Sequence, residues 1–415
     1  MWLQQTTPMQ RRALLAAFAG YGVDGFDLMI YTFLIPTLLT VWGMTKAQAG
    51  YIATGALITS AIGGWLAGVL ADRYGRVRVL QLTVLWFAFF TFLSGFTGSF
   101  WQLLVTRSMQ GFGFGGEWAV GSVLVAETIA PRHRGKAAGL VQSSWSFGWA
   151  GAALAFWIVA ALLPAAFAWR VAFWIGILPA LLVVYIRRKV DEPALAVAAR
   201  RRAAARPSSA QMLDIFRAPV RTTTLRASLL STGMLAAYYS VTTWLPTFLK
   251  SERHLSVTDT TGYLLVLILG SFVGYLTNAW LSDWIGRRRA IMLFAAGGAP
   301  LVLLYTRLAL GERQMLALGF LLGFFLLGIF AAMGAFLAEL FPSAVRCAGQ
   351  GFCYSVGRAI GAVCPALIGV WSSRISLGQS IGAMTAAAFA LVIIAAWTLP
   401  ETRGRVLSVE AGVAA

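Results

Sequence analysis

Two aspartates near the start of the chain have the type and spacing of a proton-carrying pair. Asp24 and Asp27 lie in the stretch GYGVDGFDLMIY, about halfway along a long apolar segment. Residues three apart on a helix share a face, so both carboxylates are expected to project in the same direction. Two like charges this close cannot both ionise at low cost in a medium of low dielectric. We therefore predict proton coupling here, and favour Asp27 because it lies deeper.

A third carboxylate, Glu117, is the second-to-last residue of the stretch RSMQGFGFGGEW, deep inside another apolar run. An ionisable side chain at that depth costs several kcal/mol unless it is paired, hydrated or protonated. Two interpretations remain open: a structural pair with a basic residue, or a second protonation site.

The glycines of this stretch could also suggest a phosphate-binding loop, but such a loop needs a preceding strand and a helix N-terminus after it. These glycines lie within a continuous apolar run instead. On a helix, Gly111 and Gly115 share one face, and small residues there let a neighbouring helix approach closely. We predict a helix-packing surface.

One arginine, Arg358 in YSVGRAIGAVCPALIG, falls near the middle of another apolar run. Arginine stays charged and offers a rigid fork of donors for a carboxylate. It could anchor the anionic group of a substrate, or form a permanent ion pair with Glu117 or one of the aspartates near residue 25. The two roles are compatible, because an ion pair of Arg358 that breaks when the substrate enters would couple substrate binding to release of the paired carboxylate.

Polar and aromatic residues within the apolar runs are candidates for lining a pocket, although each could instead serve packing or interfacial anchoring. The strongest group is YYSVTTW, whose hydroxyls suit an oxygen-rich solute. The candidates are Tyr31, Gln142, Trp145, Trp149, Tyr238, Tyr239, Trp244, Asn278 and Tyr354.

The composition places all these residues in a membrane protein. Of the 415 residues, 59% are hydrophobic and 12% are charged, too few charges to cover a soluble protein of this size. The net charge of +18 comes from short basic clusters between apolar runs, a pattern of membrane topology and not of nucleic-acid binding. No metal-ligand spacing or catalytic triad occurs, so we expect neither an enzyme nor a cofactor, with the proton gradient as the energy source.

Runs of about 20 apolar residues, the length that crosses a bilayer, predict an all-α protein. The expected spans are 14–41, 48–71, 79–98, 101–127, 137–163, 169–187, 226–249, 260–282, 290–308, 314–340, 348–371 and 379–399.

Lysine and arginine concentrate at the termini and in the loops after even-numbered spans, which predicts that both termini are cytoplasmic. The polar, arginine-rich segment between spans six and seven is expected to be a cytoplasmic linker. The predicted units are an N-terminal six-helix bundle at 1–190, a linker at 191–225, a C-terminal bundle at 226–405 and a short tail at 406–415.

The two halves repeat. GVLADRYGRVR, beginning at Gly68, aligns with AWLSDWIGRRR 211 residues later, and ETIAPRHRGKAAG, beginning at Glu127, aligns with ELFPSAVRCAGQG 212 residues later. Two matches at nearly one spacing indicate an internal duplication, with a binding site expected between the two bundles.

These motifs resemble a known family. GVLADRYGR is similar to the signature loop of the major facilitator superfamily, RSMQG to its second motif, and LPETRG to its frequent ending. The resemblance covers essentially the whole chain and implies two pseudo-symmetric six-helix bundles. It also implies a part for Arg107 in proton transfer, although a residue near the outer end of a span could equally extend to the interface. The second copy of the loop departs from the pattern, with Trp284 in place of Arg73 and Ala279 in place of Gly68.

Within that superfamily, GYGVDGFDLMIY and GGEWAVGSVLVAE resemble the proton symporters for organic acids, of the sialic acid and carboxylate permease type, with aromatic-acid and metabolite symporters close behind. One alternative is a proton-coupled exporter of metabolites or drugs, although the fifth span lacks the Gly-Pro signature of drug antiporters. Another is a transporter-like sensor, which a long soluble extension would favour.

Charged residues at the predicted cytoplasmic helix ends are expected to latch the bundles in the outward-facing state, with positive-inside topology as the plainer alternative. They are Asp72, Arg73, Arg76, Glu127, Arg134, Asp283, Arg287, Glu339 and Arg346.

The expected mechanism is alternating access in the inner membrane, with import driven by the proton gradient. A proton neutralises Asp27, Asp24 or Glu117, and a carboxylate pairs with Arg358, so that the loaded carrier crosses without unpaired charge. The expected partners are a small organic acid, protons and the lipid bilayer, with no nucleic acid, and the chain is expected to act as a monomer.

Overall fold

A computed structural model describes residues 6–74, 76–128, 134–178, 180–181, 214–218, 220–308, 311–341 and 346–403. Apart from turns, caps and connections, these residues are helical. For part of them, near the predicted cytoplasmic ends of several helices, the backbone alone is described.

Helices occupy each of the predicted spans of the first half. They are α1 (Pro8–Val41), α2 (Lys46–Tyr74), α3 (Arg76–Ser94), α4 (Phe100–Thr128), α5 (Arg134–Leu162) and α6 (Ala165–Ile175). The chain enters α1 through a capping box, in which Thr7 accepts from the Gln10 backbone and the Gln10 side chain accepts from Thr7.

The second half begins with the short helix η3 (Asp214–Phe216), and two of its spans are interrupted. The helices are α10 (Val220–Ser251), α11 (Val257–Ile285), α12 (Arg287–Arg307), α13 (Glu312–Gly328), α14 (Phe330–Leu340), α15 (Arg346–Gly361), α16 (Cys364–Trp371) and α17 (Leu377–Thr398). Helices α13 and α14 together form the tenth predicted span, and α15 and α16 form the eleventh.

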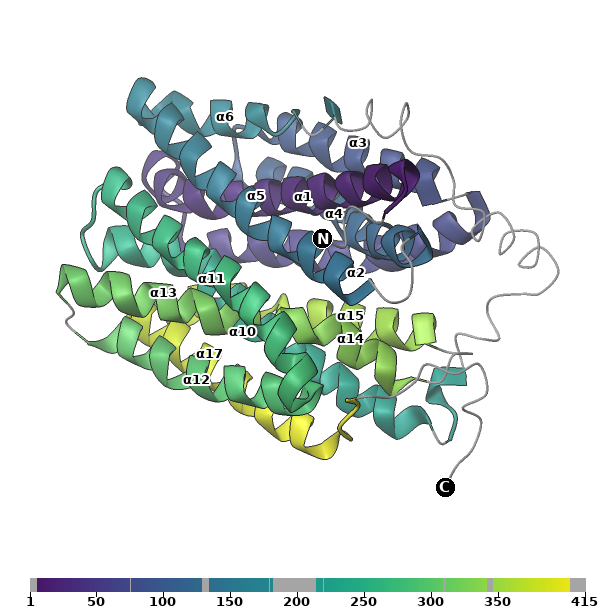
Figure 1. The fold of residues 1–415 in the computed structure, drawn as a ribbon. Coiled ribbons are helices and arrows are strands. Elements are labelled where there is room, and N and C mark those ends of the chain that lie inside the picture. The colour runs from purple at the N-terminus through teal and green to yellow at the C-terminus, as the bar shows by residue number, and fades with distance from the viewer. Residues whose placement is uncertain are drawn as a thin grey trace.

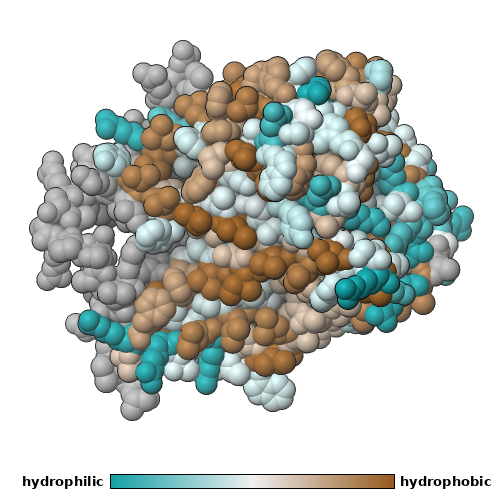
Figure 2. Space-filling model, turned by 180° about the vertical axis from the view of Figure 1, so that it is seen from behind, coloured by the Kyte–Doolittle hydropathy of each residue, from teal (hydrophilic) through white to brown (hydrophobic). Residues whose placement is uncertain are grey.

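The surface of the helices suits a lipid environment. In the described part of the chain, nine helical segments are long and apolar enough to cross a bilayer. Large apolar side chains such as Leu82, Trp101 and Trp397 are mostly exposed. Hydrophobic side chains cover the middle of one face of the molecule, and hydrophilic ones gather toward its ends (Figure 2). The protein is a multi-pass membrane protein.

The helices form two bundles, one from α1 to α6 and one from α10 to α17, with the pairs α13–α14 and α15–α16 each standing for one predicted span (Figure 1). Equivalent helices pack in both. The pairs α2 with α4, α1 with α5 and α3 with α6 correspond to α11 with α13, α10 with α15 and α12 with α17. The bundles meet where α2 packs on α15 and α16, where α5 packs on α11, and where α1 packs on α10. The predicted duplication is therefore visible in the packing.

Glycines bring the paired helices together. A Cβ on Gly111 would lie 2.1 Å from the Ala56 carbonyl oxygen, and one on Gly115 would lie 1.7 Å from that of Ser60. The second bundle repeats the device, because a Cβ on Gly270 would lie 2.0 Å from the Phe320 oxygen. The prediction that Gly111 and Gly115 form a packing surface is confirmed.

Candidate functional site

The carboxylate of Asp27 is fully buried and held by side chains from two other helices. Thr91 on α3 donates its hydroxyl to Oδ1, and Gln110 on α4 donates its amide to Oδ2. Hydrogen bonds to an ionised carboxylate stabilise the charged form, at about 1.5–3 kcal/mol each. Sequence reasoning missed Thr91 and Gln110. The available signal for Gln110 was its position three residues after Arg107, on the same helix face.

Arg107 completes this cluster. Its Nη1 lies 3.7 Å from Oδ1 of Asp27, and its Nη2 donates to the Asp27 carbonyl oxygen at 3.3 Å. The guanidinium lies between the rings of Tyr31 and Phe173, 5.6 and 5.7 Å from their centroids. The side chain is 1% exposed, so the alternative of an arginine extending to the bilayer interface is wrong. Arg107 points inward because its face of α4 packs against α1 and α3.

The other two predicted proton carriers differ in what the structure describes. Asp24 lies one turn before Asp27 on α1 and is also fully buried. The side chain of Glu117 lies outside the described part of the structure.

Arg358, on α15, is a buried cation enclosed by aromatic rings. Its guanidinium lies 5.1 Å from the Phe114 ring centroid and 4.9 Å from that of Tyr354, and Nη2 donates to the Tyr354 hydroxyl at 3.3 Å. Among the residues whose side chains are described, no carboxylate pairs with it. The proposed permanent pair with Asp27 does not form, because Asp27 is paired with Arg107 instead.

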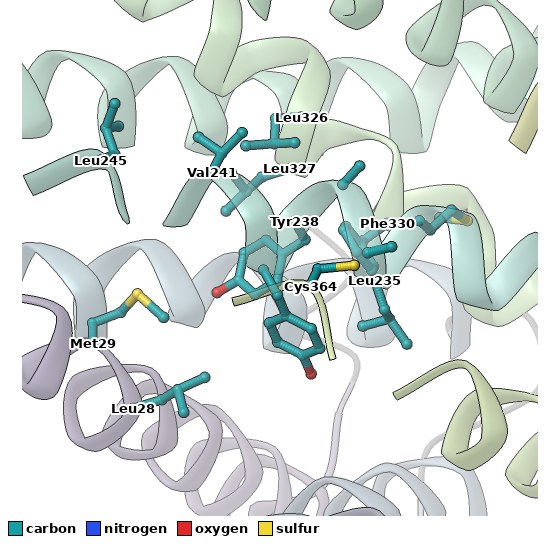
Figure 3. Close-up of a cluster of buried hydrophobic side chains, with 14 of the residues drawn as sticks. Leu28, Met29, Leu235, Tyr238, Val241, Leu245, Leu326, Leu327, Phe330 and Cys364 are labelled. Atoms are coloured by element: carbon teal, nitrogen blue, oxygen red, sulfur yellow. The ribbon is translucent and has the colours of Figure 1, made fainter. Parts of the chain in front are cut away.

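An aromatic cluster extends from Arg358 across the two bundles. Trp145 on α5 lies 5.0 Å from Tyr21 and 6.2 Å from Tyr238, between ring centroids, and Tyr238 lies 5.2 Å from Tyr239. Of these rings, Tyr21 was not anticipated, although it lies one turn before Asp24 on the same helix face. Figure 3 shows Tyr238 with Leu235 and Val241, and Leu28 and Met29 of α1 nearby.

A small pocket lies between the two bundles, and Arg107 is one of its lining residues. Helix α1 contributes Tyr31 and Thr32, with Leu28 and Met29, and α2 adds two alanines and a leucine. The remaining polar lining is Arg107, Tyr239, Thr242 and Thr243. Tyr239 also lies close enough to Arg358 to interact with it. The pocket therefore connects the Asp27 cluster in one bundle with the surroundings of Arg358 in the other.

The remaining predicted pocket residues are not among the residues lining this cavity. The Trp244 indole donates to the Pro365 carbonyl at 3.0 Å, and the Asn278 amide donates to the Gly328 carbonyl at 2.7 Å. These bonds join helices of the second bundle. Trp149 is fully buried, and Gln142 is half-buried on α5.

Three predicted gating residues of the second bundle, Asp283, Arg287 and Glu339, come together. Arg287 pairs with Asp283, and its Nε lies 3.6 Å from Oε1 of Glu339. Glu401, from LPETRG, accepts the backbone N–H of Arg287 at 2.8 Å, at the N-terminus of α12. Thr402 donates to Glu339 at 2.5 Å. These described contacts lie within one bundle.

Six other predicted gating side chains lie outside the described part, so their latching role stays a prediction. They are Asp72, Arg73, Arg76, Glu127, Arg134 and Arg346.

At the other end of the molecule the bundles are in close contact. A Cβ on Gly50 of α2 would lie 2.6 Å from the Pro365 carbonyl oxygen, and one on Gly369 of α16 would lie 2.5 Å from that of Lys46. The Thr54 hydroxyl donates to the Ala362 carbonyl at 2.6 Å. We call the contact around Gly50 and Gly369 the outer closure, because it lies at the end of the helices that the sequence predicts to face outward.

Comparison with known proteins agrees with this architecture. The Major Facilitator Superfamily model matches residues 17–314, and the model for "Sugar (and other) transporter" matches residues 227–410. The chain belongs to the major facilitator superfamily. The resemblance seen in the sequence motifs is thereby confirmed.

Three relatives align over nearly the whole chain. A probable 4-methylmuconolactone transporter from Cupriavidus pinatubonensis is 42% identical over 97% of this chain and 93% of its own. A cis,cis-muconate transport protein from Acinetobacter baylyi is 31% identical over 94% of each chain. A sialic acid transporter from Escherichia coli is 29% identical over 95% of each.

A solved structure shares the fold. The inward-open conformation of the xylose transporter XylE from Escherichia coli aligns with a TM-score of 0.75 at 19% identity, over 96% of this chain and 98% of that one. The chain is thus a member of a transporter superfamily with that superfamily's fold.

Proposed function

We propose that this protein imports an organic acid by proton symport through alternating access. The observation that carries the proposal is Arg358, a buried cation without a carboxylate partner among the described side chains, which interacts with Tyr239 in the lining of a pocket between the bundles. A buried, unpaired cation is costly, so a carboxylate from the substrate would relieve that cost. Muconate and sialic acid, named for two of the relatives, are carboxylates.

The proton site we propose is Asp27. Its contact with Arg107 joins α1 to α4, close to the pocket that the substrate would enter. A proton adds one positive charge at Asp27 and a carboxylate adds one negative charge at Arg358, so the net charge of the site is the same before and after both have bound. Co-binding therefore avoids carrying an extra charge through an apolar passage.

We propose the inner membrane as the location, with both termini cytoplasmic and a monomer as the working unit.

The test uses proteoliposomes and a panel of labelled acids: an aromatic monocarboxylate, cis,cis-muconate and sialic acid. An inward proton gradient should drive accumulation of at least one acid, and Arg358→Gln should abolish it. Arg313→Gln, which removes an exposed arginine on α13, is the matched control and should leave uptake intact. The symport proposal fails if no acid accumulates, and an exporter replaces it if a solute leaves the vesicles as protons enter.

A further inference from the structure

Arg107 faces two environments. On one side it contacts Asp27, and on the other it lines the pocket together with Tyr31 and Tyr239. Its Nε atom is buried and has no hydrogen-bond partner, in a side chain that is 1% exposed. The guanidinium therefore keeps unused donor capacity beside a cavity between the bundles.

The attachment of Arg107 to Asp27 depends on charge more than on hydrogen bonding. Its closest approach to the carboxylate is 3.7 Å, whereas a charge-assisted hydrogen bond spans about 2.7–2.9 Å. Thr91 and Gln110 occupy the two carboxylate oxygens instead. Neutralising Asp27 thus removes the charge attraction, and leaves only the longer hydrogen bonds from Arg107 to the Asp27 carbonyl and the Thr91 hydroxyl, at 3.3 and 3.4 Å, with its contacts to two aromatic rings.

The second arginine lies within reach of the same space. The Arg358 guanidinium contacts the ring of Phe114, which follows Arg107 by seven residues on α4. Seven residues are about two helical turns, or roughly 10 Å along the helix. Tyr239 lines the pocket with Arg107 and also interacts with Arg358. The two buried cations therefore belong to one region, one in each bundle.

We propose that Arg107 is a second substrate anchor that becomes available when a proton neutralises Asp27. The substrate of the proposed symport, on which this inference rests, then carries two oxygen-rich poles. One pole is a carboxylate for Arg358, and the other is a second carboxylate or a carbonyl oxygen for Arg107.

The charges near Asp27 support this assignment. Among the described residues, the titratable groups around it are Asp24 and Tyr31 on α1, Arg107 on α4 and Tyr239 on α10. Once Asp27 is protonated, Arg107 has no ionised carboxylate partner among the described side chains, and neither does Arg358. A molecule with one anionic group neutralises only one of them, whereas a molecule with two poles satisfies both.

The test compares two acids with the same six-carbon diene chain, hexa-2,4-dienoate with one carboxylate and hexa-2,4-dienedioate with two. Binding of each labelled acid to the purified full-length protein is measured between pH 5.5 and 8. The variants are Arg107→Gln, Asp27→Asn and Arg358→Gln, with the exposed Arg313→Gln as control. The double variant Asp27→Asn/Arg107→Gln avoids leaving Asp27 buried without its cation, should Arg107→Gln fold poorly.

We expect the wild type at low pH to bind the diacid about tenfold or more tightly than the monoacid. Asp27→Asn should keep that preference at every pH, because its Arg107 is always released. Arg107→Gln and the double variant should reduce the ratio of the two affinities to near one.

The inference is overturned if the double variant retains the diacid preference of Asp27→Asn, or if the wild type prefers the monoacid. Those results leave the proposed function standing, provided that either acid binds in a manner dependent on Arg358. If neither acid nor any member of the uptake panel binds, the proposed function itself fails.

Discussion

Replacing Gly50 by alanine should open the outer side of the protein. The added Cβ would lie 2.6 Å from the Pro365 carbonyl oxygen and 2.9 Å from the Ala366 Cα, and both are backbone atoms that cannot rotate away. Overpacking of this kind costs about 1–3 kcal/mol. This clash exists only while α2 and α16 are in contact. The gain in helix propensity from glycine to alanine is the same whether the two helices are in contact or apart, so it does not change the ratio of the two states. The ratio of outer-closed to outer-open molecules should fall by roughly 5- to 150-fold.

The assay is the distance between spin labels on Thr45→Cys and Ser373→Cys, in a variant whose native cysteines are replaced. Both positions are exposed next to the outer ends of α2 and α16, so the labels do not enter the contact. Double electron–electron resonance should show a larger population at long distance in Gly50→Ala. Gly262→Ala is the control, because a Cβ at that position of α11 meets nothing within 4 Å.

An unchanged distance distribution in a folded Gly50→Ala protein would refute this reasoning. It would mean that α2 and α16 absorb the methyl group by a local shift, and that the outer closure does not decide which state is populated.

Three further changes test other parts of the structure. Thr91→Val removes a donor to the Asp27 carboxylate, so Asp27 should accept a proton more readily, and half-maximal gradient-driven uptake should move about one pH unit or more upward. Thr83→Val, whose hydroxyl bonds only within α3, should leave that pH unchanged. Gly115→Ala should destabilise the first bundle by about 3 kcal/mol or more in thermal unfolding, since its Cβ would lie 1.7 Å from the Ser60 oxygen, and a melting temperature equal to that of Gly262→Ala would contradict this. Glu401→Gln should cost about 0.5–2 kcal/mol by removing the charge at the N-terminus of α12, and an unshifted unfolding curve would show that this charge is already screened.

The helices could be predicted because apolar length is a property of the local sequence. The spans and the packing role of Gly111 and Gly115 follow from residues close together in the chain, and the duplication follows from short motifs that recur 211 and 212 residues apart. The interruptions of the tenth and eleventh spans were missed. Pro365, just inside α16, was the available signal for the second interruption, because its missing N–H cannot continue a helix from α15.

The site was predicted only in part, because its partners come from distant segments. Asp27 and Arg358 were identified by the cost of burying charge, a cost that the sequence reveals, and Arg107 by the resemblance of RSMQG to the superfamily's second motif. The sequence did not predict which of these charged side chains contact one another. Only the packing of α1 against α4 places Arg107 on Asp27, 80 residues away in the chain, and leaves Arg358 among aromatic rings.

The uncharged residues that contact the site are even harder to identify from the sequence than the charged ones. Thr91 and Gln110 resemble many other polar residues in apolar helices until the fold places them on one carboxylate. The pocket residues Thr242 and Thr243 belong to YYSVTTW, which was singled out for its hydroxyls, but the face of α10 that borders the cavity depends on how α1 and α10 meet.

The central claim, coupled entry of an acid and a proton, is tested most directly by recording both in the same proteoliposomes. An internal pH indicator reports proton entry while a labelled acid is added outside, with no gradient imposed at the start. We expect the wild type to acidify the lumen in proportion to acid uptake, and Asp27→Asn to exchange acid across the membrane without acidification. Acid uptake in the wild type without proton entry, or acidification that accompanies solute efflux, would contradict the account.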